Sequence, residues 1–476
     1  MTTTREHGIL DRMRLLVLGG AARSTSALTD AVSALGAESL IVNDARSMEH
    51  ALARSSAGCV LVDLDGLPAD VGRERRDATI RALAERGVLV VAVGAGLDRT
   101  RVTELFAAGC RDVVAAPFQK REVILRVSAT MHGKLRIACI GGGSGLFSVL
   151  SALKDVPRVL LSSIVTMSDD GGSSGRLRAT FGVLPPGDIR RSLVALSNAP
   201  DVMNFVMQYR FREGGELDGH SLGNLLLTAL SERTGGMQSA VRALGDVLNV
   251  QGIVMCVTER STTLHAELED GHVVRGESMI DLCIERSSDL RIRRVWHEPF
   301  PETGVDVFAS IVAADVVVIG PGDLYTSILA SLLVGGVGEA LRRTRAECIY
   351  VCNMMTKPGE TSNYDVADHA AAIVDAIGED VLAHVLVSNT ALDEKAVAEY
   401  AARSQHPVVM ASPERLTAVT RANVVLADVG HRALLVRHDG EKLRENLLLL
   451  IGKLRPSFVV PGGGPAMRPS QPMPGE

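Results

Sequence analysis

The chain has 476 residues, of which 46% are hydrophobic and 22% are charged, a length and composition that fit a globular protein of two or three domains. Its formal net charge is −6, from 50 Lys and Arg against 56 Asp and Glu, so no overall basic field favours nucleic acid or an anionic membrane as a partner. Aromatic residues make up only 3% of the chain, which argues against surfaces that stack nucleic-acid bases.

The N-terminal segment, MTTTREHGILDRM, is polar, and a short apolar run follows it. That run is far below the roughly 20 residues that a membrane span needs. The seven cysteines are dispersed along the chain, which favours reduced, buried thiols over a disulfide framework. We therefore expect a cytoplasmic protein with no membrane span and no nucleic-acid partner.

Residues 13–132 alternate apolar runs with helical stretches. The expected strands are RLLVLGG, SLIVND, CVLVDLDG, VLVVAVGAG and DVVAAPF. Strands that alternate with helices predict a doubly wound parallel sheet. The order of these features resembles the flavodoxin-like receiver domains of two-component signalling, which makes 13–132 the first expected domain.

The likeness to a receiver stops at the phosphorylation site. Asp63 lies at the end of the third expected strand, where a receiver has its phosphoacceptor aspartate. However, the loop LGGAARS lacks the acidic pair that would bind Mg²⁺, and Ala116 replaces the receiver's lysine. We expect a degenerate domain that serves packing, self-association or contact with a protein partner. A phosphorylated switch is the alternative.

Residues 135–455 form the second expected domain, which again alternates strands with helices and predicts a Rossmann-like α/β fold. Its middle, NVQGIVMCVTERSTTLHAELEDGHVVRGES, contains short strand-like runs and predicts a small β insertion. The tail at 456–476 is rich in Pro and Gly without periodicity, so we expect it to be disordered.

A glycine-rich loop joins strand to helix in LRIACIGGGSGLFSVLSALK. Its backbone N–H groups at a helix N-terminus favour an anion, although the full dinucleotide pattern G-x-G-x-x-G is missing. The loop predicts phosphate or nucleotide binding, with a purely structural turn as the alternative. Its candidate ligand-binding residues are Gly141, Gly142, Gly143, Ser144 and Gly145.

The next expected strand ends in SDDGGSSGRLR, where two carboxylates stand beside glycines, serines and arginines. This combination suits a metal–phosphate site or the binding of sugar or ribose hydroxyls. A polar turn is the alternative. The candidate ligand-binding residues are Asp169, Asp170, Gly171, Gly172 and Ser173.

Two helix starts further along the chain carry polar residues. PPGDIRRSLVALS offers Asp188 and Arg190, although an acid near a helix N-terminus is also favoured for local reasons. GHSLGNLLL offers Asn224 as a ligand contact. His220 in the same motif is either a proton carrier or a residue that only hydrogen-bonds.

A second glycine loop follows a later strand in VVVIGPGDLYTSILASLL, with Gly320 and Gly322 as candidate ligand-binding residues. Ligands in open α/β sheets bind outside the carboxyl ends of the strands. We therefore expect the strand-end loops of this domain to converge on one crevice.

These motifs, together with TTLHAELEDG and TKPGETSNYDVADH, resemble the gluconeogenesis factor family. That family belongs to a wider CofD-like group that includes 2-phospho-L-lactate transferase. The resemblance covers about 135–450 and implies a Rossmann-like fold that binds a nucleotide at the strand ends. It does not extend to 13–132, which lies outside the usual family architecture.

The two branches of the group imply different functions. The gluconeogenesis factor branch implies a regulatory protein that binds UDP-sugars and links carbon metabolism to cell shape and envelope synthesis, with no reaction assigned. The transferase branch implies a Mg²⁺-dependent enzyme acting on a nucleoside diphosphate ester, with Asp169 and Asp170 as metal ligands. GHSLGNLLL and TKPGETSNYDVADH favour the first branch. The incomplete glycine pattern and the DDGG loop count against a third class, the NAD(P)-linked oxidoreductases.

Overall fold

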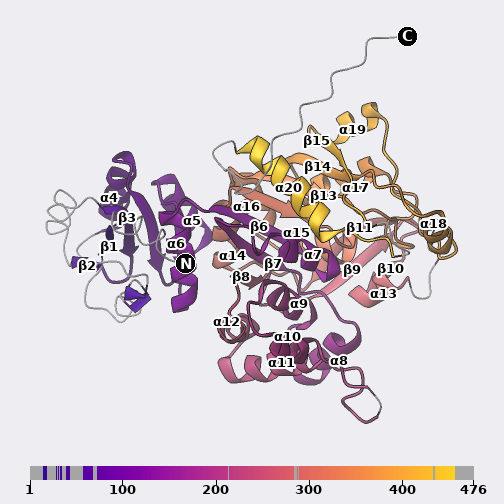
Figure 1. Cartoon of the computed structure of the whole chain (residues 1–476), viewed down its shortest axis with the longest axis horizontal. Coiled ribbons are helices and arrows are strands. Elements are labelled where there is room, and N and C mark those ends of the chain that lie inside the picture. The colour runs from indigo at the N-terminus through magenta and orange to yellow at the C-terminus, as the bar shows by residue number, and fades with distance from the viewer. Residues whose placement is uncertain are drawn as a thin grey trace, which may run out of the picture.

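Two parallel sheets with their helices form the body of the protein in the computed structural model (Figure 1). The structure describes residues 14–18, 28, 30–31, 33–34, 39–42, 57–67, 72–212, 214–283, 287, 289–431 and 435–455. The tail expected to be disordered, 456–476, lies outside the described residues. No described helix is both long and apolar enough to cross a membrane.

The first sheet has five parallel strands in the order β2-β1-β3-β4-β5, which is the order of flavodoxin-like folds. The predicted doubly wound sheet is therefore confirmed. Its strands are β1 (Arg14–Leu18), β2 (Ser39–Val42), β3 (Ala57–Asp63), β4 (Leu89–Gly94) and β5 (Asp112–Ala115). Its helices include α4 (Arg73–Glu85), α5 (Arg99–Ala107) and α6 (Lys120–Met131).

The second sheet has seven parallel strands in the order β15-β14-β13-β12-β6-β7-β8. The strands are β6 (Leu135–Gly141), β7 (Val159–Val165), β8 (Gly252–Cys256), β12 (Val316–Ile319), β13 (Glu347–Val351), β14 (Leu382–Ser388) and β15 (Asn423–Ala427). The strand order reverses between β6 and β12, as in Rossmann folds, and ligands bind at such a switch point. The Rossmann-like prediction is confirmed.

The predicted β insertion is also confirmed, and it contains three antiparallel strands in the order β10-β9-β11. These strands are β9 (Thr263–Leu268), β10 (Val273–Arg275) and β11 (Ile292–Glu298). The short helix α13 (Glu277–Asp281) follows β10. The insertion therefore places α13 close to the strand-end loops discussed below.

Helices connect the strands of the second sheet and cover it. Those before β13 are α7 (Gly143–Leu153), α8 (Gly172–Phe181), α9 (Gly187–Leu196), α10 (Asp201–Gln208), α11 (Leu222–Thr234), α12 (Met237–Val247), α14 (Val305–Val312), η1 (Leu324–Leu329), α15 (Ala330–Leu332) and α16 (Val337–Arg343). Those after β13 are α17 (Val366–Ile377), α18 (Glu394–Ala401), α19 (Pro413–Val419) and α20 (Gly440–Leu454).

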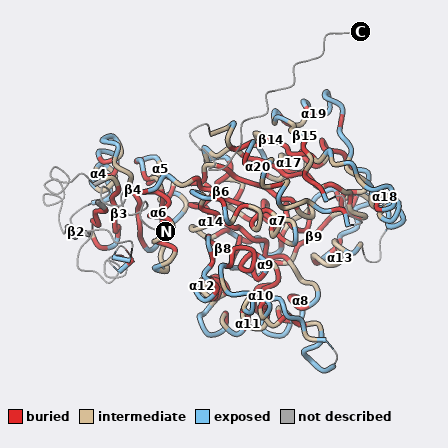
Figure 2. Tube along the Cα trace, viewed as in Figure 1, coloured by how far each residue is buried: buried red, intermediate tan, exposed pale blue. Residues whose placement is uncertain are grey.

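The strands carry the buried core (Figure 2). Every residue of β12, from Val316 to Ile319, is fully buried, because parallel strands have helices or other structure on both faces and read as continuous apolar runs. All seven cysteines are free thiols, and every one except Cys283 is buried. Their positions agree with the expected buried thiols.

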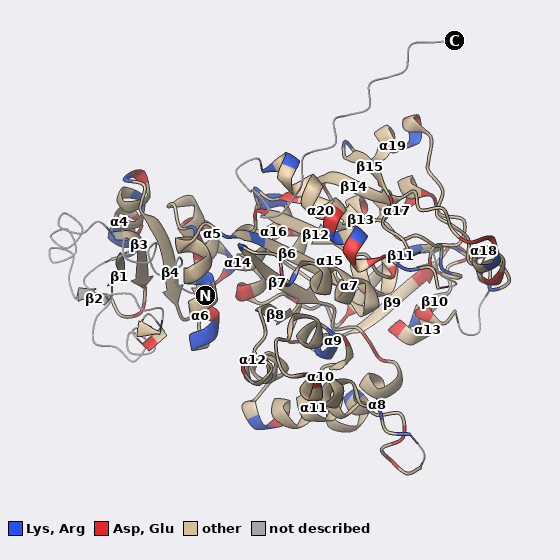
Figure 3. Ribbon diagram, viewed as in Figure 1, with Lys and Arg blue, Asp and Glu red and all other residues tan. Residues whose placement is uncertain are grey.

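The two sheets are joined through α6, which leads into β6, and charged residues lie on both sides of the junction (Figure 3). Arg126 on α6 is buried and its guanidinium lies 3.1 Å from both Asp112 and Glu122. It also donates to Ser310 Oγ on α14 at 2.6 Å. Because α5 and β5 pack against α14 as well, this face of the first sheet is covered by the rest of the chain.

Candidate functional site

The two predicted glycine loops lie against each other at the switch point. β6 and β12 are neighbours in the sheet, so the loops that follow them leave the same edge side by side. A Cβ atom on Gly145 would overlap the Pro321 carbonyl oxygen, and it would lie 2.5 Å from the Pro321 carbonyl carbon and 3.0 Å from Gly322 N. Gly320 has φ +74°, a left-handed conformation that favours glycine. Glycine is thus required here for both close approach and backbone shape.

A cavity of about 330 Å³ opens beside these loops, within the size range of small-molecule sites. Ser144, Gly145 and Gly322 line it, and the first N–H groups of α7 have no acceptor within that helix. The other polar and charged residues in its wall, all outside the predicted set, are Ser148, Asp323, Asn353, Thr356, Lys357, Tyr400, Gln405, Arg437 and His438. The cavity therefore combines backbone donors with cationic side chains.

Asp188 reaches into the glycine loop. Its Oδ2 accepts from Gly143 N at 2.8 Å, and a Cβ atom on Gly142 would lie 2.6 Å from the same oxygen. Burial raises the pKa of this carboxyl group, although Arg191 opposes the shift. Asp188 lies in the first turn of α9, where an acid is favoured locally, but α9 has no side-chain cap hydrogen bond. The carboxylate instead ties α9 to the start of α7.

Four other predicted residues form one buried hydrogen-bonded chain beside these loops. Arg190 Nε donates to Asn224 Oδ1 at 2.9 Å, and Asn224 Nδ2 donates to Ser173 Oγ at 3.1 Å. Ser173 Oγ lies 3.1 Å from His220 Nδ1. Burial lowers the pKa of the Arg190 guanidinium to about 10, and burial together with nearby arginines lowers the pKa of His220. These side chains bond one another, and a direct ligand contact by any of them stays a prediction.

The paired aspartates have separate local partners. Asp170 accepts backbone N–H groups of Glu277 at 3.0 Å and Ser278 at 2.8 Å, so it stabilises the first turn of α13. Asp169 Oδ1 accepts from Gly171 N at 3.0 Å. Gly171 immediately precedes α8, and Gly172 is its first residue. Burial, followed by repulsion from Asp169 and other acids, raises the pKa of Glu277 to about 9.

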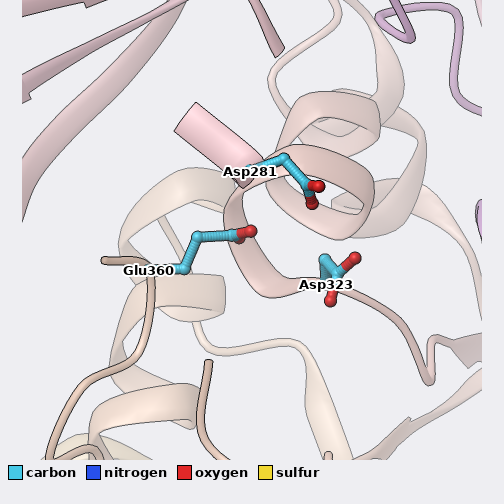
Figure 4. A group of neighbouring side chains, drawn as sticks. All are labelled: Asp281, Asp323 and Glu360. Atoms are coloured by element: carbon cyan, nitrogen blue, oxygen red, sulfur yellow. The ribbon is translucent and has the colours of Figure 1, made fainter. Parts of the chain in front are cut away.

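Figure 4 shows a second group of acids, of which Asp323 lines the cavity. Asp281, Asp323 and Glu360 have carboxylate oxygens within 4.8 Å of one another. The Lys357 ammonium group contacts all three, at 2.9 Å for Asp323 and 3.0 Å for Glu360. Burial alone would lower the pKa of Lys357, but these carboxylates raise it. Glu360 also accepts from Tyr325 N at 3.0 Å, which holds the start of η1.

Sequence reasoning did not select this group, although two local signals were available. Asp323 directly follows Gly322, and Lys357 and Glu360 both lie in the TKPGETSNYDVADH motif. Asp281 carries no such signal, because it reaches the group only through the fold of the β insertion.

Known proteins share this architecture. The 2-phospho-L-lactate transferase CofD family matches residues 137–429. The gluconeogenesis factor of Bacillus subtilis is 41% identical over 321 residues, which are 67% of this chain and 99% of that protein. The chain belongs to the CofD-like gluconeogenesis factor family.

Other members support the same assignment. The gluconeogenesis factor of Halalkalibacterium halodurans is 39% identical over 328 residues, 69% of this chain and 99% of that protein. A crystal structure of a UPF0052 family protein from Bacillus halodurans superposes with a TM-score of 0.63 at 39% identity, covering 66% of this chain and 99% of that one. The family match begins at residue 137, so the five-stranded sheet of this chain lies before it.

Proposed function

We propose that this protein is a regulatory protein that binds a nucleotide sugar, with a UDP-sugar as the favoured ligand, between the loops that follow β6 and β12. The observation that carries the proposal is the packing of two glycine loops at the switch point, beside a cavity of about 330 Å³. Backbone N–H groups at such a position suit a diphosphate.

Each part of the ligand has proposed partners. The N–H groups of Ser144, Gly145 and Gly322 would hold the diphosphate, with Arg437 supplying positive charge from the cavity wall. Asp169 or Asp170 would bind ribose or sugar hydroxyls. The buried chain that includes Arg190 and Asn224 would hold α9 and α11 in position behind the loops.

The proposed role is cytoplasmic and regulatory. Ligand binding would report the supply of nucleotide sugars and so link carbon metabolism to cell shape and envelope synthesis. The five-stranded sheet, docked through α5, β5 and α6, would carry the signal to a protein partner through the faces that remain uncovered.

A Mg²⁺-dependent transferase is the second candidate, favoured by the grouped carboxylates of Asp281, Asp323 and Glu360. Carboxylate oxygens are the ligands that Mg²⁺ prefers, and a bound cation would neutralise charge on a transferred phosphoryl group. The fit is incomplete, because Lys357 already contacts all three acids. Asp170 fits no better as a metal ligand, since both of its oxygens accept backbone N–H groups.

Calorimetric titration separates the two candidates. The full-length protein would be titrated with UDP-N-acetylglucosamine, UDP-glucose, GDP and NAD, each with Mg²⁺ and with EDTA. Micromolar binding of a UDP-sugar in both conditions is the expected result. Binding of GDP alone, and only with Mg²⁺, would replace the regulatory proposal with the transferase. Binding of NAD alone would overturn both.

A further inference from the structure

A second cavity, of about 400 Å³, lies where the two sheets join. Leu89 and Arg111 from the first sheet's region line it, as do Lys134, which lies between α6 and β6, and Leu135, the first residue of β6. Arg158 and Asp315, which immediately precede β7 and β12, complete much of the wall. The cavity thus lies at the amino ends of the strands, at the opposite edge of the sheet from the glycine loops.

The charges in this wall are strongly unbalanced. It contains the cationic residues Arg111, Lys134, Arg136, Arg158 and Arg455 against the single acid Asp315. Arg111 forms an ion pair with that acid, because its Nη2 lies 2.8 Å from Asp315 Oδ1. Neither Lys134 nor Arg158 forms an ion pair with any residue that the structure describes. Like charges held close together repel, so an anion would relieve the repulsion.

Two buried donors also lack acceptors here. Arg136 is 6% exposed, and its Nε has no hydrogen-bond partner within the described part of the chain. The same holds for Arg455 Nε. Leaving a buried donor unsatisfied is costly, and such groups in folded proteins call for an explanation such as a missing ion. Burial lowers the pKa of both Lys134 and Arg136, and a bound anion would oppose that shift.

We propose that this cavity binds a small phosphate-bearing anion, separate from the ligand of the glycine loops. Its volume exceeds that of the water-sized voids common in protein interiors and leaves room for a diphosphate or a sugar phosphate. The anion would contact Arg111 on one side of the junction and Arg158 and Arg455 on the other. Arg136 Nη2 also lies 3.4 Å from Asp112 Oδ2, within the buried ion pairs that join the sheets. Anion binding therefore stabilises the junction between them.

The test compares two double variants of the full-length protein. Lys134→Glu/Arg158→Glu reverses charge at two of the three cavity cations that form no ion pair with a residue the structure describes. Arg75→Glu/Arg81→Glu makes the same change in net charge on the exposed face of α4. Inorganic phosphate, inorganic pyrophosphate, ribose 5-phosphate and UDP-N-acetylglucosamine would be titrated into each protein by calorimetry. Circular dichroism would confirm that both variants are folded.

Pyrophosphate or ribose 5-phosphate should bind the unchanged protein, and the cavity variant should bind it about tenfold more weakly or worse, as expected for lost charged hydrogen bonds. The α4 variant should retain the affinity. UDP-N-acetylglucosamine affinity should be the same in all three proteins. The phosphate probes therefore test this cavity whether or not a nucleotide sugar binds at the glycine loops. Equal affinity of the phosphate probes in all three proteins, or no binding to the unchanged protein, would overturn the proposal.

Discussion

Replacing Gly145 with alanine should force apart the two glycine loops on which the site depends. The added Cβ would overlap the Pro321 carbonyl oxygen and lie 2.5 Å from the Pro321 carbonyl carbon. Carbon atoms in contact are about 3.5 Å apart, so the loops would have to separate by roughly 1 Å. The obstructing atoms belong to the backbone of a neighbouring loop, which cannot move aside as a flexible side chain can. We expect a loss of about 1–3 kcal/mol in the free energy of unfolding, as for overpacked sites.

Urea unfolding and calorimetric titration with UDP-N-acetylglucosamine would measure the two consequences. Gly452→Ala is the matched control, because its Cβ on α20 meets nothing within 4 Å and should stabilise the helix by about 0.5–1 kcal/mol. The control should bind ligand normally, whereas Gly145→Ala should bind it weakly or not at all. If Gly145→Ala kept both the unfolding midpoint and the affinity of the unchanged protein, the loop contact would not matter to the site.

Four further predictions concern stability, pH and phosphorylation. Asp170→Ala should lower the free energy of unfolding in urea by about 1–2 kcal/mol, as for a lost helix cap. If Asp170 also binds ligand, the affinity should fall about 10- to 150-fold, or by about 1.5–3 kcal/mol. Unchanged affinity would show that Asp170 only stabilises α13. Folding raises the pKa of Glu277 from 4.5 to about 9, so its protonated form stabilises the native state at low pH and that stability is lost as pH rises. The free energy of unfolding of the unchanged protein, relative to Glu277→Gln, should therefore fall between pH 5 and 9, and a flat difference would contradict the shift. Arg126→Met removes a charged partner of Asp112, which stays buried. The free energy of unfolding in urea should fall by about 3–5 kcal/mol, and a change below about 1 kcal/mol would show that the ion pairs at the junction contribute little. Acetyl phosphate with Mg²⁺ should not label Asp63, and a stoichiometric mass gain lost in Asp63→Asn would restore the phosphorylated switch.

The sequence was most informative where local pattern determines structure. Continuous apolar runs such as β12 predict buried parallel strands, and glycines after β6 and β12 predict strand-end loops, because both signals lie within a few residues. The structure brings the loops of Gly145 and Gly322 together as the switch point requires. Such patterns do not predict which partner an individual polar side chain will contact.

Those directions depend on contacts between segments far apart in the chain. Arg190 and Asn224 both read as ligand contacts, yet each has the other as its nearest polar partner. Asp188 was a candidate ligand contact, with a local preference for the helix start as the alternative, but it accepts the N–H of Gly143, 45 residues earlier. Asp281, Asp323 and Glu360, which all contact Lys357, come from three segments that meet only after folding. Local spacing carries no information about any of these pairings.

The junction between the sheets gives a similar lesson. From the sequence, 13–132 was expected to serve packing, self-association or partner contact. In the structure α5, β5 and α6 pack against the second sheet's helices, so self-association through that face would require the junction to open. The packing role therefore has a physical basis, and any protein partner would contact another face.

A crystal structure of the full-length protein with UDP-N-acetylglucosamine tests the central claim most directly. We predict that the diphosphate lies between the loops at 141–145 and 320–322, within hydrogen-bonding distance of the backbone N–H groups of Gly145 and Gly322. A nucleotide bound elsewhere, with the 330 Å³ cavity beside these loops free of ligand, would contradict it.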